Sequence, residues 1–179
     1  MKHKYLLLLL ICFFSNKIFC MGAGIQIESI SPLRFNQFSL DKAMNYSTDY
    51  EFICLGTMKS DRYPIIFGAG LNIGLEEEQS YIGSSGFLDF PYVDQQIKNN
   101  WNINFGSGLS YNFKYYIGKT DFNYSIGGRL FLGTNWILSD NYYELYIQQN
   151  LETRYVFYSM AGNKIILCFP TDIGIRWHF

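Results

Sequence analysis

Strict alternation of apolar and polar residues marks the last seventeen residues of the chain, 163–179, and this pattern constrains the fold most strongly. From Ile165 to Phe179 every second residue is apolar, with Thr171 as the one exception, and the residues between are mostly polar. Side chains of a β-strand point alternately to opposite faces, so a period of two residues predicts a strand with one apolar face. This strand would end on an aromatic carboxyl terminus, which a soluble domain has no reason to do.

The same alternation recurs along the chain and predicts strong strands at 63–76, 101–118, 121–137 and 142–158. Helices are disfavoured in these segments, because each interior glycine costs a helix about 1 kcal/mol. Weaker alternation predicts two more strands at 22–30 and 46–57.

The seven strands found by pattern leave one strand missing. A bacterial single-chain barrel has an even number of strands, with both termini on the periplasmic side. Topology therefore requires a strand at 80–92, although Gly83 to Gly86 interrupt its pattern, and it requires an inner turn at 94–100. The predicted fold is all-β: an antiparallel up-and-down transmembrane β-barrel of eight strands.

The composition agrees with an envelope protein. Aromatic residues make up 19% of the chain and charged residues only 16%, below the ~25% of charged residues in ordinary soluble domains. After the first twenty residues there is no apolar run near the ~20 residues that a membrane-spanning helix needs.

Residues 1–20 have the features of a secretory signal peptide, and 21–179 would form the mature barrel domain. Lys2 and Lys4 precede a short apolar run from Tyr5 to Phe14, and cleavage is expected after Cys20. The alternative is that Cys20 is lipidated. Either way the chain is exported, and its predicted location is the cell outer membrane. Without the three lysines of this segment, 11 basic residues face 15 acidic ones, a net charge of −4, and no basic patch indicates nucleic acid.

Two cysteines remain in the predicted mature chain, Cys54 and Cys168. They could form one disulfide in an oxidising compartment. Because the strand pattern points their side chains in different directions, we predict free thiols.

Aromatic residues provide a check on the strand count. Membrane-spanning barrels carry aromatic girdles at both interfaces. In an eight-strand topology, one group of aromatic residues would gather at the periplasmic edge of the lipid-facing surface: Trp101, Trp136, Tyr143, Trp177 and Phe179.

With these features the chain resembles the small eight-stranded outer-membrane barrels of diderm bacteria, the shape class of OmpA, OmpX and OmpW. The resemblance covers the whole predicted mature chain and is architectural, resting on the signal, the alternation and the terminal aromatic residue. It implies outer-membrane lipid as a partner. It also implies that the insertion machinery of that membrane recognises the C-terminal strand. The Asn-, Ile-, Tyr- and Lys-rich composition suggests an AT-rich genome, such as that of a spirochaete.

Charged residues on the polar faces would lie inside the barrel. Because charges cannot remain unpaired in a narrow interior of low dielectric constant, carboxylates and guanidinium groups should meet there. One interpretation is a structural plug of ion pairs, and the alternative is a narrow polar pore or a ligand pocket opening outward. The predicted lumen network consists of Glu28, Glu51, Arg129, Glu144, Glu152, Arg154, Asp172 and Arg176.

No catalytic, metal or cofactor site is predicted. Of the two histidines, His3 lies in the signal, and His178 would face inward at the periplasmic floor. Asp172 lies six residues from His178, about 20 Å along a strand, so the two cannot form a catalytic dyad. We therefore predict a protein that is not an enzyme.

Function is expected at the outer rim, where residues 31–45 form the longest predicted loop. A longer first strand or a disordered tip is the alternative for this segment. Two functions remain open: a non-enzymatic barrel for envelope structure or for contact with an extracellular ligand or protein, and a pore or transporter for a small, hydrophobic molecule. The candidate loop residues are Leu33, Arg34, Phe35, Phe38 and Leu40.

Overall fold

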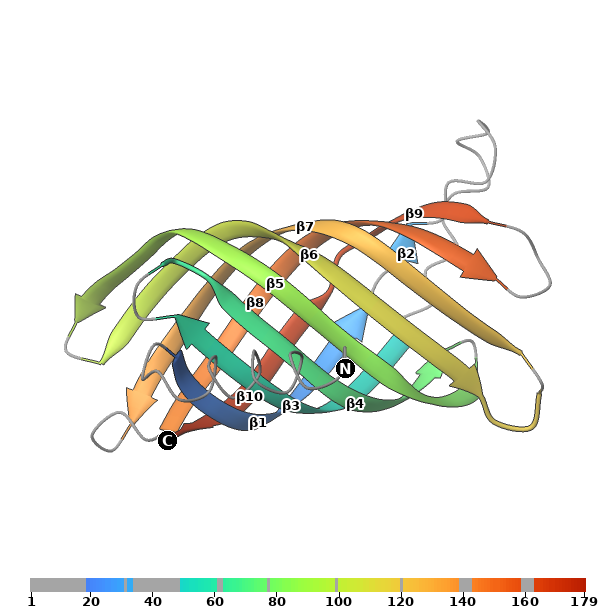
Figure 1. Cartoon of the computed structure of the whole chain (residues 1–179), viewed down its shortest axis with the longest axis horizontal. Coiled ribbons are helices and arrows are strands. Elements are labelled where there is room, and N and C mark those ends of the chain that lie inside the picture. Colours follow the sequence, from blue (N-terminus) through green and yellow to red (C-terminus); the bar gives the residue numbers. More distant parts are fainter. Residues whose placement is uncertain are drawn as a thin grey trace, which may run out of the picture.

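Antiparallel strands account for nearly all the residues that the structure, a computed structural model, describes: 19–30, 32–33, 49–60, 63–76, 78–98, 100–119, 121–138, 143–158 and 163–179. The strands wind around one axis with a common tilt (Figure 1). They are β1 (Phe19–Ile30), β2 (Pro32–Leu33), β3 (Asp49–Ser60), β4 (Ile66–Glu76), β5 (Gln79–Lys98), β6 (Trp101–Tyr116), β7 (Phe122–Leu138), β8 (Tyr143–Tyr158), β9 (Lys164–Cys168) and β10 (Thr171–His178).

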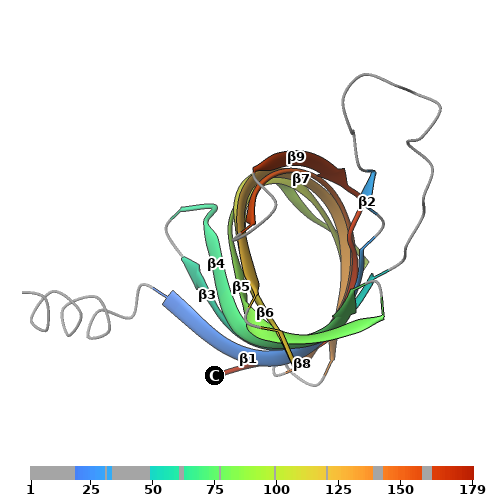
Figure 2. The same ribbon diagram turned by 90° about the vertical axis from the view of Figure 1, so that its right-hand side faces the viewer.

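The sheet closes on itself, because β10 pairs with β1 on one side and with β8 on the other. β2 continues the line of β1 and lies at the start of the predicted loop 31–45, for which a longer first strand was the alternative. The predicted strand 163–179 is divided in two, and β10 continues β9 after Pro170. The register does not change across this interruption, since Cys168 pairs with Glu152 and Thr171 with Gln149. Proline lacks a backbone N–H to donate to the sheet. The predicted eight-stranded antiparallel barrel is confirmed, and Figure 2 shows its closed wall end-on.

The strand expected from topology alone is confirmed as β5, but it is the longest strand and spans 20 residues. The predicted inner turn at 94–100 is wrong, because β5 continues to Lys98 and pairs with the start of β6. Two register shifts, between Pro91 and Val93 and between Gln96 and Lys98, take up extra residues along this pairing. Bulges of this kind bend a strand and increase its twist.

The two faces of the strands differ as predicted. In β7 buried and exposed residues alternate from Phe122 to Leu132, with the apolar side chains outward except at Phe131. Leu71 and Leu132, for example, are 72% and 57% exposed. Among the described residues there is no helix long and apolar enough to cross a membrane.

Both described chain ends lie at the same end of the barrel, which we call the terminal end; the opposite end is the distal end. β1 begins at Phe19, two residues before the predicted mature start, and cleavage after Cys20 stays a prediction. Cys54 is exposed on the outer surface, Cys168 is buried, and both are free thiols, as predicted.

Four inward-facing aromatic rings each lie over the glycine directly opposite on the neighbouring strand. A Cβ atom added to any of these glycines would come within 2.3–2.6 Å of the ring. The absent side chain therefore makes room for the ring in a narrow lumen. The pairs are Tyr81 with Gly74, Phe87 with Gly68, Phe131 with Gly106, and Tyr146 with Gly174.

We expect Gly74→Ala to lower the free energy of unfolding by about 1–3 kcal/mol, since the new methyl group would overlap the Tyr81 ring. Gly128 provides the matched control, because it is exposed and a Cβ there would meet no atom within 4 Å. Gly128→Ala should change stability by no more than about 1 kcal/mol. Urea unfolding of protein refolded in detergent micelles measures both, and equal effects would contradict the packing argument.

Candidate functional site: the lumen and the terminal vestibule

A cluster of buried ion pairs crosses the lumen at mid-height. Arg154 is the centre of this group: its Nε lies 2.6 Å from Glu152 Oε2, and its Nη2 lies 3.4 Å from Glu28 Oε1. Arg129 Nε lies 3.2 Å from Asp89 Oδ1, and Arg129 Nη1 lies 3.7 Å from Glu152 Oε1. We call these five residues the central cluster. They come from β1, β5, β7 and β8, so the cluster ties together distant parts of the wall.

A second polar layer lies towards the distal end. The Glu51 carboxylate accepts hydrogen bonds from the Asn72 amide and from the Tyr81 hydroxyl, the latter at 2.9 Å. Closer to the rim, Lys114 Nζ lies 2.9 Å from Glu76 Oε2. Each buried charge in this layer therefore has a partner, as burial in a medium of low dielectric constant requires.

The space left around the central cluster is very small. A void of about 20 Å³ is lined by Glu28, Arg129 and Arg154 together with neighbours from β3, β5 and β6. That volume holds about one water molecule. Among the described residues, the side chains at this level therefore leave room for little more than a single water molecule.

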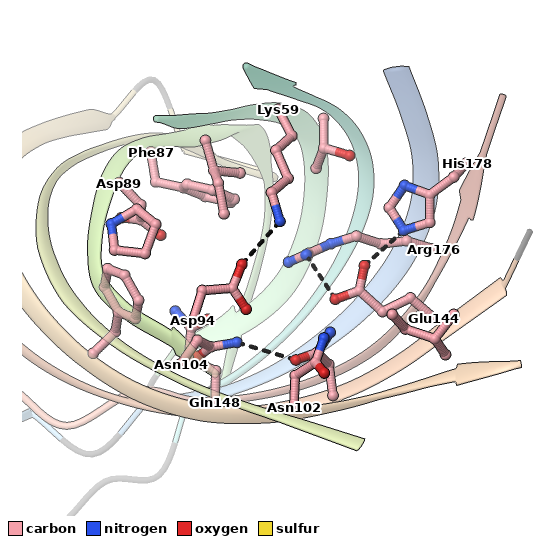
Figure 3. Close-up of a pocket in the computed structure, with 16 residues that line it drawn as sticks. Lys59, Phe87, Asp89, Asp94, Asn102, Asn104, Glu144, Gln148, Arg176 and His178 are labelled. Carbon is pink, nitrogen blue, oxygen red and sulfur yellow. Dashed lines mark hydrogen bonds and ion pairs between the residues drawn. The ribbon is translucent and has the colours of Figure 1, made fainter. Parts of the chain in front are cut away.

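A larger cavity of about 330 Å³ lies between the central cluster and the terminal end, and we call it the terminal vestibule (Figure 3). Its lining residues are Thr57, Lys59, Ile66, Phe87, Asp89, Pro91, Asp94, Asn102, Asn104, Phe131, Asn135, Ile137, Glu144, Gln148, Arg176 and His178.

The charged side chains that line the vestibule form ion pairs. At the mouth, Lys59 Nζ lies 3.0 Å from Asp94 Oδ2, with both side chains partly exposed. Deeper inside, the Glu144 carboxylate lies 3.5 Å from Arg176 Nη1 and 2.7 Å from His178 Nε2 (Figure 3). The Arg176 guanidinium also stacks on the Tyr146 ring, 3.9 Å from its centroid.

The residues predicted to form one lumen network fall into separate groups. Glu28, Arg129, Glu152 and Arg154 meet in the central cluster, and Glu144 and Arg176 meet in the vestibule. Glu51 belongs to the distal layer, and Asp172 accepts a hydrogen bond of 2.8 Å from Asn150. All eight are on the inner side of the barrel, and their role in function stays a prediction.

Sequence reasoning missed Asp89, although it is only 3% exposed and pairs with Arg129. Its signal was present, because Asp89 lies between two apolar residues, Leu88 and Phe90, in the segment expected to be the weakest strand. His178 does line the inner face as predicted. Its carboxylate partner is Glu144 from β8, whereas the intrastrand Asp172 considered from sequence is too far away.

The aromatic residues expected at the periplasmic edge gather at the terminal end. Trp101 and Trp136 stack with ring centroids 5.6 Å apart, and Tyr143 meets Trp177 edge-to-face at 6.3 Å. Phe179 is 75% exposed. Their placement at a membrane interface stays a prediction.

The candidate loop residues fall largely outside the described residues, which include none of Arg34, Phe35, Phe38 and Leu40. Leu33 ends β2 and pairs with Leu167. In the described part of the chain, no group of three or more histidine, cysteine or acidic residues is arranged to hold a metal ion.

Comparison with known proteins finds the likeness in structure alone. No family model and no curated protein matches the chain. Neisserial surface protein A (NspA) superposes with a TM-score of 0.55 at 14% identity, over 90% of this chain and 97% of that one. Ail of Yersinia pestis matches at 8% identity over 90% of this chain and 97% of that one, with a TM-score of 0.37. OmpT of Vibrio cholerae matches at 10% identity over 92% of this chain and 53% of that one, with a TM-score of 0.33. The superposition on NspA shows that this chain has the fold of a small eight-stranded outer-membrane barrel.

Proposed function

We propose that this protein is a non-enzymatic integral outer-membrane barrel that acts in envelope structure or in surface interaction. The observation that carries the proposal is the central cluster. Its five charged groups fill the lumen at mid-height and leave a void of only about 20 Å³. A barrel closed in this way supports an anchoring or binding role at its ends better than it supports transport.

Three kinds of partner follow from this proposal. The exposed apolar belt suits contact with outer-membrane lipid, because buried apolar area contributes roughly 25 cal/mol per Å². The aromatic C-terminal strand suits recognition by the insertion machinery. An extracellular ligand or protein would be met at the distal rim, where the predicted loop residues follow β2.

The second candidate function is a narrow pore or transporter for a small, hydrophobic molecule. The terminal vestibule favours this function, because the cavity extends from the terminal end up to Asp89 of the central cluster and the neighbouring Phe87. Passage beyond this point would require the Arg129 and Arg154 side chains to leave their carboxylate partners.

In planar lipid bilayers, we expect the purified protein to show no stable conductance steps, because the central cluster leaves no continuous aqueous path. The Arg129→Ala and Arg154→Ala variants test this directly, since each removes a bulky cation from the closed layer. Stable conductance steps in the wild-type protein that change size in either variant would contradict the proposal and support the pore function instead.

A further inference from the structure

Apolar side chains line part of the terminal vestibule, whereas the rest of the lumen is lined mostly by polar side chains. In a hydrated lumen, inward-facing apolar side chains remain incompletely buried, which forfeits part of the stabilisation that burial would provide. Contact with the barrel wall buries part of the surface of these side chains, but Ile66, Phe87 and Ile137 remain partly exposed. The apolar lining residues are Ile66, Phe87, Pro91, Phe131 and Ile137.

The two phenylalanine rings have a defined orientation. Each lies against the wall over the glycine opposite, Phe87 over Gly68 and Phe131 over Gly106. Phe131 is only 3% exposed, so its ring is almost fully covered, whereas the Phe87 side chain remains partly exposed. The Arg129 guanidinium lies over both rings, 4.8 Å from the Phe87 centroid and 5.8 Å from the Phe131 centroid, and forms the floor of the vestibule.

The polar groups that the vestibule offers are mainly amides. Its carboxylates are already paired with Arg129, Arg176, His178 or Lys59, whereas an amide side chain carries both donors and an acceptor. Asn135 Oδ1 accepts from Asn104 Nδ2 at 3.4 Å, so within the described chain the Asn135 N–H groups remain available. Gln148 Nε2 donates to Asn150 Oδ1 at 2.8 Å. Within the described chain, the side-chain carbonyl of Gln148 therefore also remains available to a ligand.

From this combination we propose that the terminal vestibule binds a short neutral saccharide of one or two rings. A sugar ring has an apolar C–H face to lie against the partly exposed side chains of Ile66, Phe87 and Ile137, and a rim of hydroxyl groups to meet the amides. A charged ligand would have to compete with existing ion pairs. A wholly apolar ligand would leave the surrounding amides without hydrogen bonds, which is costly. The volume of about 330 Å³ is at the lower end of the range for small-molecule pockets.

The proposal concerns the vestibule alone and does not depend on whether the lumen conducts. It is tested by titrating the full chain, refolded in amine-oxide micelles to avoid sugar-headed detergents, with N,N′-diacetylchitobiose and with maltose. Glucuronic acid and glycylglycine are the charged and zwitterionic comparisons. Saturation-transfer NMR and calorimetry should show saturable binding of at least one neutral disaccharide, and weaker binding of the comparisons. No saturable binding of either neutral sugar, or stronger binding of a charged compound, would overturn the proposal.

Variants place the binding in the vestibule. Asn135→Ala should weaken the affinity about three- to tenfold, the loss expected for one hydrogen bond. Ile137→Trp should abolish binding by filling the cavity. Asn123→Ala is the matched control, because Asn123 is a buried inward amide at the distal end, bonded to Tyr116. Circular dichroism verifies that each variant folds. If Ile137→Trp does not fold, the pair of asparagine variants decides. Equal weakening by Asn135→Ala and Asn123→Ala, or unchanged binding by a folded Ile137→Trp, contradicts the proposal.

Discussion

Replacing Arg154 with methionine should lower the free energy of unfolding by about 3–5 kcal/mol, the cost of breaking a buried ion pair by removing one partner. Methionine retains much of the side-chain volume, so the loss reports on charge. Without the guanidinium, Glu152 and Glu28 would remain as buried carboxylates whose closest cation is gone. Urea unfolding in detergent micelles, followed by tryptophan fluorescence, measures the change.

Lys59→Met is the control for this prediction, because it removes a cation from an ion pair that is 52% and 37% exposed. Exposed pairs contribute about 0–1 kcal/mol, so this variant should be nearly as stable as the wild-type protein. Adding Glu152→Gln to Arg154→Met should restore part of the lost stability, since it removes one uncompensated charge. Similar losses in Arg154→Met and Lys59→Met would show that the central cluster is not a stabilising plug.

Phe179→Ala is expected to remove most of the protein from the outer-membrane fraction of cells that express it, while its stability after refolding in micelles stays close to that of the wild type. The Phe179 side chain is 75% exposed, and its backbone N–H donates to Met21 O at 3.0 Å, a bond that alanine keeps. The expected loss in cells therefore reflects recognition by the insertion machinery.

Phe122→Ala serves as the matched variant, since Phe122 is an outward aromatic residue at the distal end and is 42% exposed. It should reach the membrane at the wild-type level. Membrane fractionation with quantitative immunoblotting, alongside refolding yields in micelles, separates assembly from stability. The prediction is contradicted if Phe179→Ala reaches the membrane at the wild-type level, or if its refolding yield in micelles falls as much as its level in the membrane. Either result would show that the C-terminal residue is not part of the assembly signal.

The C-terminal strand and its four strongest companions could be predicted from sequence, because their side chains repeat every two residues with little interruption. The pattern alone did not identify β5. Gly83 and Gly86 break its alternation, yet an added Cβ at Gly83 would lie only 1.9 Å from the Phe113 carbonyl oxygen, so the glycine is required by close contact with β6. The need for an even number of strands identified what the local pattern could not.

The sequence by itself determined which side of each strand faces inward, since this follows from local periodicity. It determined the eight strands only when the pattern was combined with the rule that such barrels have an even number of strands. It did not determine which inward residues meet. Arg154 and Glu28 are 126 residues apart and come together only because the tilt and closure of the sheet bring β8 and β1 around the same narrow lumen. Likewise, register alone places Phe87 and Phe131 over glycines and creates the terminal vestibule. Alternation is a property of each strand, whereas pairing across the lumen is a property of the closed barrel.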